Sequence, residues 1–300
     1  MPFQDEEKFP AASADGGQQA EQTGADSALA PASEPVAEVP ARPAKLVPED
    51  LRAPWGWLDL LLFLGITVLA TFALGIVLVV ALSALGHNLM ELRTSPRVGG
   101  IAGIVYEVAL FALVLGCIAL YLRLRYGTPF WRTVGWRPLE AGRYPEALVY
   151  ASFIGGGFLL AFVVQLLSAY FGTNAKLPME ALFRDRLVAL LLLLMAVLVA
   201  PVVEETFFRG LLYPVVARSF GRGVGIVVTG TLFGLMHAAQ LWGGWTQIAL
   251  LVAVGIILTY ARAVKRTVLA SFLLHFSYNL AISLAFLIFS HGLRVLPKGS

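Results

Sequence analysis

Residues 187–217 read LVALLLLLMAVLVAPVVEETFFRGLLYPVVA, and this stretch decides the fold. Its first half is apolar enough for a membrane-spanning helix, but Glu204, Glu205 and Arg209 follow in the same run. A charged side chain in hydrocarbon costs roughly 2.5–3.5 kcal/mol on insertion scales, so such residues persist where they face a protein interior. The stretch therefore predicts a membrane helix that carries a buried polar cluster.

The spacing of the charges within this stretch separates the two glutamates. Pro201 lacks a backbone donor and frees the carbonyl of Val197, so we expect the helix to kink or restart there. Glu205 and Arg209 are four residues apart and share one helical face, where they can form an ion pair. Glu204 points about 100° away. It stays unpaired and is the candidate general base.

The composition of the whole chain supports the membrane interpretation. The 300 residues are 58% hydrophobic and 14% charged, with a mean hydropathy of +0.77. Soluble domains have about 45–50% apolar and about 25% charged residues. The net charge of +3 does not suggest nucleic acid, and the single Cys117 excludes a disulfide within the chain and a cysteine-based metal site.

Seven segments are apolar and long enough to approach the thickness of a bilayer, which needs about 20 residues per helix. The first could hide a break, so we predict an all-α, polytopic membrane bundle of 7–8 transmembrane helices over residues 54–290. Residues 1–53 are rich in Ala, Pro, Glu, Gln and Ser, which predicts a disordered tail, and residues 291–300 form a short C-terminal tail. The seven apolar segments are 55–86, 100–122, 146–170, 187–217, 223–239, 245–262 and 267–289.

Basic residues in the loops predict the orientation. With a cytoplasmic N-terminus, the cytoplasmic loops hold thirteen Lys and Arg residues and the opposite loops hold seven. The high usage of Ala, Leu, Gly and Arg is typical of a bacterial protein, so we expect a multi-pass protein of the bacterial inner membrane. The loop 123–143 mixes arginines with Phe130, Trp131 and Trp136, a pattern that favours an interfacial membrane anchor or a substrate-guiding lip.

Two further apolar segments carry polar side chains. His237 follows Gly230 and Gly234, whose four-residue spacing lets helix backbones approach closely. His275 and Asn279 are again four residues apart and share a helical face. A free carboxylate, two imidazoles and an amide are the groups that activate water and stabilise an oxyanion. These residues predict a hydrolytic site within the membrane.

Together these motifs resemble the signature motifs of the CPBP family, the intramembrane proteases that include type II CAAX prenyl endopeptidases and the Ras-converting enzyme (also the Abi family). The resemblance covers about residues 185–285, the predicted catalytic core, and implies a multi-helix membrane fold with a conical cavity. It implies that Glu204 activates the attacking water with help from His237, that His275 and Asn279 stabilise the oxyanion, and that Glu205, Arg209 and Phe233 support the site.

Such a site could work with or without a metal ion. Members of the family have been described both as metalloproteases and as glutamate-dependent proteases. Glu204, His237 and His275 could ligate zinc and leave a position open for water. Alternatively, Glu204 could act directly as the base without a metal. The chain has no HExxH, GxSxG or GxxxxGK[ST] motif, so zincin, serine-hydrolase and P-loop interpretations lack their signatures.

The expected partners are the lipid bilayer and a membrane-associated peptide or protein substrate, which could be CAAX-like or prenylated. The function predicted is an intramembrane endopeptidase. One alternative is a catalytically inactive scaffold or bacteriocin-immunity protein of the same family, in which the polar cluster only holds helices together. A proton-conducting transporter or channel is the second alternative, but no inverted repeat or pair of broken helices supports it.

Overall fold

The computed structural model describes residues 48–172 and 178–295, and every regular element in these ranges is a helix. Two short elements, η3 and η4, are π-helices, whereas η1 and η2 are 3-10 helices. The elements in order are η1 (Glu49–Leu51), α1 (Trp57–Ala84), α2 (Leu89–Thr94), α3 (Pro96–Tyr126), α4 (Phe130–Thr133), α5 (Glu146–Phe171), η2 (Pro178–Arg184), α6 (Arg186–Leu194), η3 (Met195–Val199), α7 (Ala200–Glu205), η4 (Thr206–Leu212), α8 (Tyr213–Phe220), α9 (Arg222–Met236), α10 (Trp245–Lys265) and α11 (Val268–Phe289).

Six of the described helical stretches are long and apolar enough to cross a membrane. The prediction of an all-α membrane bundle is confirmed, and six of the expected 7–8 spans reach this length among the described residues. The expected span 223–239 forms the 15-residue helix α9, which at about 1.5 Å per residue reaches about 22 Å. The first expected span is one uninterrupted helix, α1, so it adds no eighth crossing.

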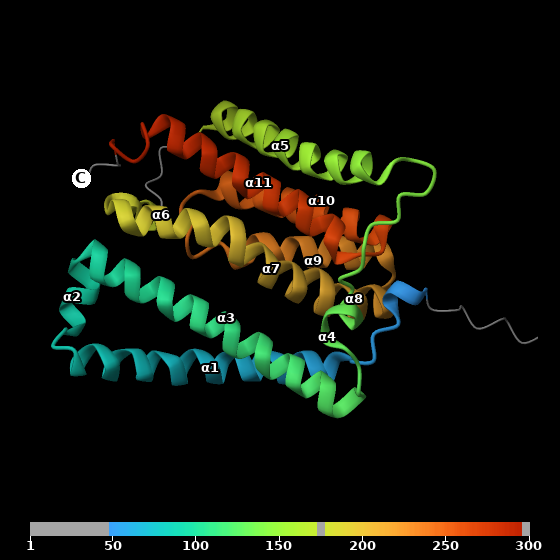
Figure 1. Cartoon of the computed structure of the whole chain (residues 1–300), viewed down its shortest axis with the longest axis horizontal. Coiled ribbons are helices and arrows are strands. Elements are labelled where there is room, and N and C mark those ends of the chain that lie inside the picture. The colour runs from blue at the N-terminus through green and yellow to red at the C-terminus, as the bar shows by residue number, and fades with distance from the viewer. Residues whose placement is uncertain (1–47, 173–177, 296–300) are drawn as a thin grey trace, which may run out of the picture. The chain divides into compact units, whose positions relative to one another are not determined.

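Close helix pairs assemble the part of the bundle that holds the polar residues. Figure 1 shows α9 beside α10 and α5 beside α11, and both pairs are in contact. A Cβ added at Gly230 would lie 2.5 Å from the backbone nitrogen of Ile256, and one at Gly234 would lie 2.6 Å from that of Val252. Only glycine allows this approach of α9 to α10, as the four-residue spacing predicts.

An N-terminal strap, residues 48–56, packs against the C-terminal half of the motif helix, the continuous helical stretch Arg186–Phe220 that carries both glutamates. Leu51 and Trp55 are 3% and 1% exposed, and the Trp55 indole donates to the carbonyl of Leu211 at 3.0 Å. The guanidinium of Arg218 donates to the carbonyls of Ala53 and Trp55 at 2.6 and 2.7 Å. The expected disordered tail therefore does not include residues 48–53, because these contacts order them. Its residues 1–47 lie outside the described residues.

The expected C-terminal tail likewise begins as part of the packed structure. Leu293 is 8% exposed and packs in a cluster with Ala189 and Leu193 of α6. Residues 296–300 of this predicted tail lie outside the described residues.

The motif helix changes its hydrogen-bond register before it reaches the glutamates. The backbone N–H of Ala200 donates to Met195 in the i+5 register of a π-helix. The i+5 partner of the Ala196 carbonyl would be Pro201, which has no N–H. Ala196 thus loses its regular helical partners, and the restart expected at Pro201 occurs where α7 begins. The π register moves the freed carbonyl from the predicted Val197 to Ala196.

Candidate functional site

The predicted ion pair forms at the centre of the site. Arg209 Nη1 lies 2.9 Å from Glu205 Oε1, and both side chains are 0% exposed. The remaining edges of the Arg209 guanidinium donate to the carbonyl of Gly255 at 2.9 Å and to the Thr259 hydroxyl at 3.2 Å. Its Cζ atom lies 4.4 Å from the centre of the Phe233 ring. The buried guanidinium is thus balanced by one carboxylate and held by α10.

His275 of α11 joins the two glutamates. Its Nδ1 atom lies 2.9 Å from Glu205 Oε1, and its Nε2 atom lies 3.7 Å from Glu204 Oε2. An ionised carboxylate only accepts hydrogen bonds, so Nδ1 carries the proton in the contact with Glu205. The other nitrogen is then directed at Glu204, whose side chain is 13% exposed. One imidazole therefore connects a neutralised carboxylate with a free one.

His237 reaches the same aromatic cluster by a different route. It follows the last residue of α9, and its Nδ1 atom lies 3.0 Å from the carbonyl of Phe233. The Phe233 ring contacts both imidazoles, with centroid distances of 5.2 Å to His237 and 5.4 Å to His275. A carbonyl accepts, so Nδ1 of His237 donates and Nε2 is its free basic nitrogen. The polar contact of His237 is with this carbonyl rather than with Glu204.

Asn279 lies one turn after His275 and binds the backbone of the motif helix. Its Nδ2 atom donates to the Ala196 carbonyl at 2.7 Å. This is the carbonyl that the π register and Pro201 leave without a helical partner. The amide therefore fixes α11 to the helix that carries the glutamates, and its second N–H is left for another acceptor.

Three contacts of the site could not be assigned from the sequence. Gly255 and Thr259 hold Arg209, and their four-residue spacing on α10 was the available signal. Trp136 was expected in an interfacial loop, yet its indole donates to the Thr206 hydroxyl at 2.9 Å. Thr206 directly follows Glu205, so the loop after α4 reaches the motif helix.

The residues expected as zinc ligands do not form a metal site in the described part of the chain. No group of three or more His, Cys, Asp and Glu side chains among the described residues is arranged to hold a metal ion. The Nδ1 atoms of His275 and His237 are held by Glu205 and by the Phe233 carbonyl, which leaves the Nε2 atoms as the ring nitrogens that a metal would use. Ligation of zinc by Glu204, His237 and His275 therefore stays a prediction.

The site thus contains a buried Glu–Arg pair, a second glutamate and two imidazoles that come from separate parts of the chain. A family model described as type II CAAX prenyl endopeptidase Rce1-like matches residues 186–281. These residues form an Rce1-like domain. It covers about a third of the chain and includes each of the predicted site residues.

The Rce1-like domain is similar to CAAX-type intramembrane proteases, the family that the matching model describes. With the six apolar helices, it makes the chain an integral, multi-pass membrane protein. No curated protein and no solved structure matches the chain. The roles of individual residues therefore depend on the geometry of the site itself.

Proposed function

We propose that the protein is an intramembrane endopeptidase in which Glu204 activates the attacking water. The observation that carries this proposal is the arrangement of both glutamates around His275. Glu205 is neutralised by Arg209, whereas Glu204 keeps partial access and lies 3.7 Å from the imidazole. That separation exceeds a direct hydrogen bond, and a water molecule can bridge it. A water held there contacts a free carboxylate and a nitrogen of fixed orientation.

His275 is positioned for this chemistry by the buried pair. Glu205 accepts from Nδ1 and fixes the tautomer and the ring plane, as a carboxylate does in other hydrolases that use an oriented histidine. In the doubly protonated ring, Nε2 becomes a donor toward the region beside Glu204, where an oxyanion would form. Arg209 keeps Glu205 ionised and immobile. The pair supports catalysis through His275 and need not touch the substrate.

His237 and Asn279 complete the proposed machinery. The hydrogen bond to Phe233 leaves Nε2 of His237 as a base that can assist Glu204 or accept a proton from it. Asn279 is held by Ala196 and keeps one N–H as a donor for the oxyanion. Each added oxyanion donor is worth about 2.7–4 kcal/mol in a serine protease, where the effect has been measured. No step in this mechanism is routed through zinc.

The substrate we propose is a membrane-associated peptide or protein, which a CAAX-type enzyme cleaves near the bilayer surface. We further propose a cytoplasmic N-terminus in a bacterial inner membrane. The basic ends of α3, α8 and α10 then face the cytoplasm, in agreement with the positive-inside rule. A prenyl group on the substrate is one form of the required membrane attachment.

The decisive experiment is cleavage of a quenched fluorescent CAAX peptide by the purified protein in lipid nanodiscs. The peptide is used with and without a farnesyl group, and wild type is compared with Glu204→Gln, which is nearly isosteric. A general base contributes about 10²–10⁴-fold to the rate, so we expect Glu204→Gln to lose at least about 100-fold. Glu140→Gln, an exposed glutamate outside the site, is the matched control and should cleave like wild type.

Two outcomes would contradict the proposal. If Glu204→Gln cleaves as fast as wild type, Glu204 is not the base. If wild type cleaves neither peptide while Glu204→Gln keeps the biological activity of the chain, the polar cluster is a scaffold.

A chelator tests whether the reaction needs a metal. We expect cleavage to persist with 1,10-phenanthroline, because no three metal-ligating side chains lie together among the described residues. Loss of cleavage that zinc restores would overturn this expectation.

A further inference from the structure

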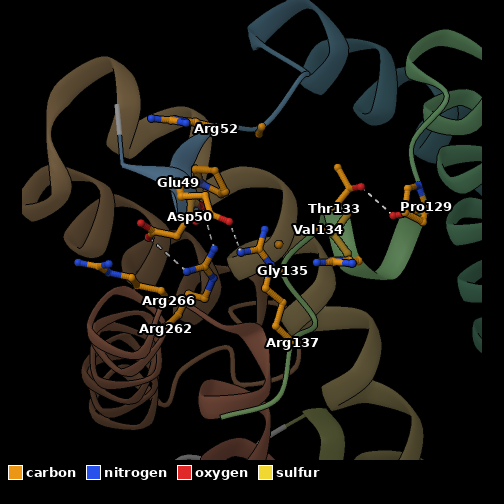
Figure 2. Close-up of a pocket in the computed structure, with 14 residues that line it drawn as sticks. Glu49, Asp50, Arg52, Pro129, Thr133, Val134, Gly135, Arg137, Arg262 and Arg266 are labelled. Atoms are coloured by element: carbon orange, nitrogen blue, oxygen red, sulfur yellow. Dashed lines mark hydrogen bonds and ion pairs between the residues drawn. The ribbon is translucent and has the colours of Figure 1, made fainter. Parts of the chain in front are cut away.

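A second cluster of charges lines a pocket away from the proposed catalytic site. The pocket has a volume of about 320 Å³ and lies between the N-terminal strap, the loop after α4 and the C-terminal end of α10. Figure 2 shows Glu49 and Asp50 of the strap meeting Arg137 and Arg262 in this pocket. Five arginines line the pocket with these two carboxylates. The arginines are Arg52, Arg132, Arg137, Arg262 and Arg266.

The deepest of these arginines is only partly satisfied by the protein. Arg262 is 1% exposed. Its Nη2 atom donates to the backbone carbonyl of Asp50 at 3.2 Å, and its Nη1 atom forms an ion pair at 3.5 Å with Asp50 Oδ2. Its Nε and Nη1 atoms have no hydrogen-bond partner among the described residues. Asp50 therefore supplies charge to Arg262 but not the full set of acceptors that a guanidinium can use.

Asp50 is shared with a second arginine, which divides its negative charge further. Arg222 Nη2 lies 3.2 Å from Asp50 Oδ1, and the Nε atom of Arg222 also has no hydrogen-bond partner in the described part of the chain. Two arginines thus compete for one carboxylate at one edge of the pocket. Arg266 and Arg132 add exposed positive charge at the pocket wall.

The shape and charge of this pocket point to a ligand class. Guanidinium groups bind phosphate oxygens through paired, charge-assisted hydrogen bonds, so the unused donors of Arg262, with the positive charge of the other lining arginines, suit an anion with several oxygens. The pocket lies where apolar helices end, beside the exposed Trp131. Basic pockets at such ends bind phosphate-bearing lipid headgroups. We propose that this pocket is a binding site for a phosphate-bearing anion.

The pocket shares a wall with the motif helix. Gly210 lines it and directly follows Arg209. A Cβ at Gly210 would lie 2.9 Å from the carbonyl of Val134, another lining residue. An anion in the pocket therefore contacts the segment that holds the buried Glu205–Arg209 pair. The binding site itself does not depend on the proposed peptidase activity.

The test measures thermal unfolding of the full-length protein with two separate sources of phosphate. One arm adds inorganic phosphate to the protein in nanodiscs of phosphatidylcholine alone. The other arm compares those nanodiscs with nanodiscs that also contain phosphatidylglycerol. The test variant is Arg132→Gln/Arg266→Gln, which removes two exposed lining charges and spares Arg262. The control is Arg143→Gln, an exposed arginine that does not line the pocket and bonds the neighbouring Tyr144.

We expect wild type and Arg143→Gln to gain the same thermal stability from the anion, and the double variant to bind it at least tenfold more weakly. The double variant should unfold like wild type when neither anion is present, which shows that its fold is kept. A shift with inorganic phosphate assigns a free phosphate group, and a shift with phosphatidylglycerol alone assigns a lipid headgroup. Equal shifts in wild type and the double variant, or no shift with either source, would overturn the proposal.

Discussion

At the scale of single residues, two adjacent glutamates have different environments because a helix turns about 100° between them. The spacing in the sequence was enough to predict the pair between Glu205 and Arg209, which are four residues apart. It could not predict the contact of Glu205 with His275, 70 residues away, because spacing along one helix says nothing about which helices meet. The proposed roles of both glutamates depend on that unpredicted contact.

Removal of the Glu205 charge should destabilise the protein. We expect Glu205→Gln to lower the free energy of unfolding by about 3–5 kcal/mol, because Arg209 would remain buried without its counter-ion. Chemical unfolding in detergent measures the change. Glu205→Gln/Arg209→Met should recover part of the loss, since an apolar replacement of a buried pair is often neutral. A single variant with wild-type stability would show that the buried pair carries no structural importance.

At the scale of elements, the break in the motif helix determines how α11 is attached. Pro201 predicts a break, but the letters of Met195–Val199 do not reveal a π-helix, because these residues are ordinary helix formers. The π register decides that the Ala196 carbonyl, rather than that of Val197, accepts from Asn279. The partner of Asn279 was therefore outside the reach of sequence reasoning, although its position on α11 was not.

A double-mutant cycle tests this attachment. Asn279→Ala should lower the free energy of unfolding by about 1–3 kcal/mol, because the Ala196 carbonyl loses its donor. Pro201→Ala supplies a backbone N–H in the i+5 register, so Asn279→Ala should cost less in the Pro201→Ala background. Unfolding midpoints of the two single variants and the double variant provide the measurement. Strictly additive losses would mean that Asn279 does not satisfy this carbonyl.

At the scale of the whole molecule, contacts between distant segments hold the N-terminal strap against the Rce1-like domain. Trp55 is 156 residues from Leu211, to whose carbonyl it donates, and Arg218 is 163 residues from the Trp55 carbonyl that it caps. Composition alone placed residues 48–53 in a tail, because a short polar stretch contains no sign of the arginine that will bind it. Most membrane helices were predicted, since their hydropathy is a local property.

Two tryptophans of this region provide a matched comparison. Trp55 is 1% exposed, and Trp57 is 46% exposed at the start of α1. We expect Trp55→Ala to cost about 3–5 kcal/mol of unfolding free energy, as for other buried aromatic truncations. Trp57→Ala should cost less, about 1–2 kcal/mol, because its exposed indole loses only the hydrogen bond to the Ser219 hydroxyl and the edge contact with Phe220. Similar losses in both variants, measured by thermal unfolding in nanodiscs, would show that the strap does not hold the fold.

The short length of α9 has a consequence for the surrounding lipid. This helix reaches about 22 Å, against a hydrocarbon thickness of about 30 Å. The turn after it leads to Trp242 and Trp245, which are 62% and 60% exposed, and tryptophans prefer the level of the headgroups. Hydrophobic mismatch of this kind is relieved by local thinning of the bilayer. We therefore expect headgroups and water to come closest to His237 on this flank of the protein.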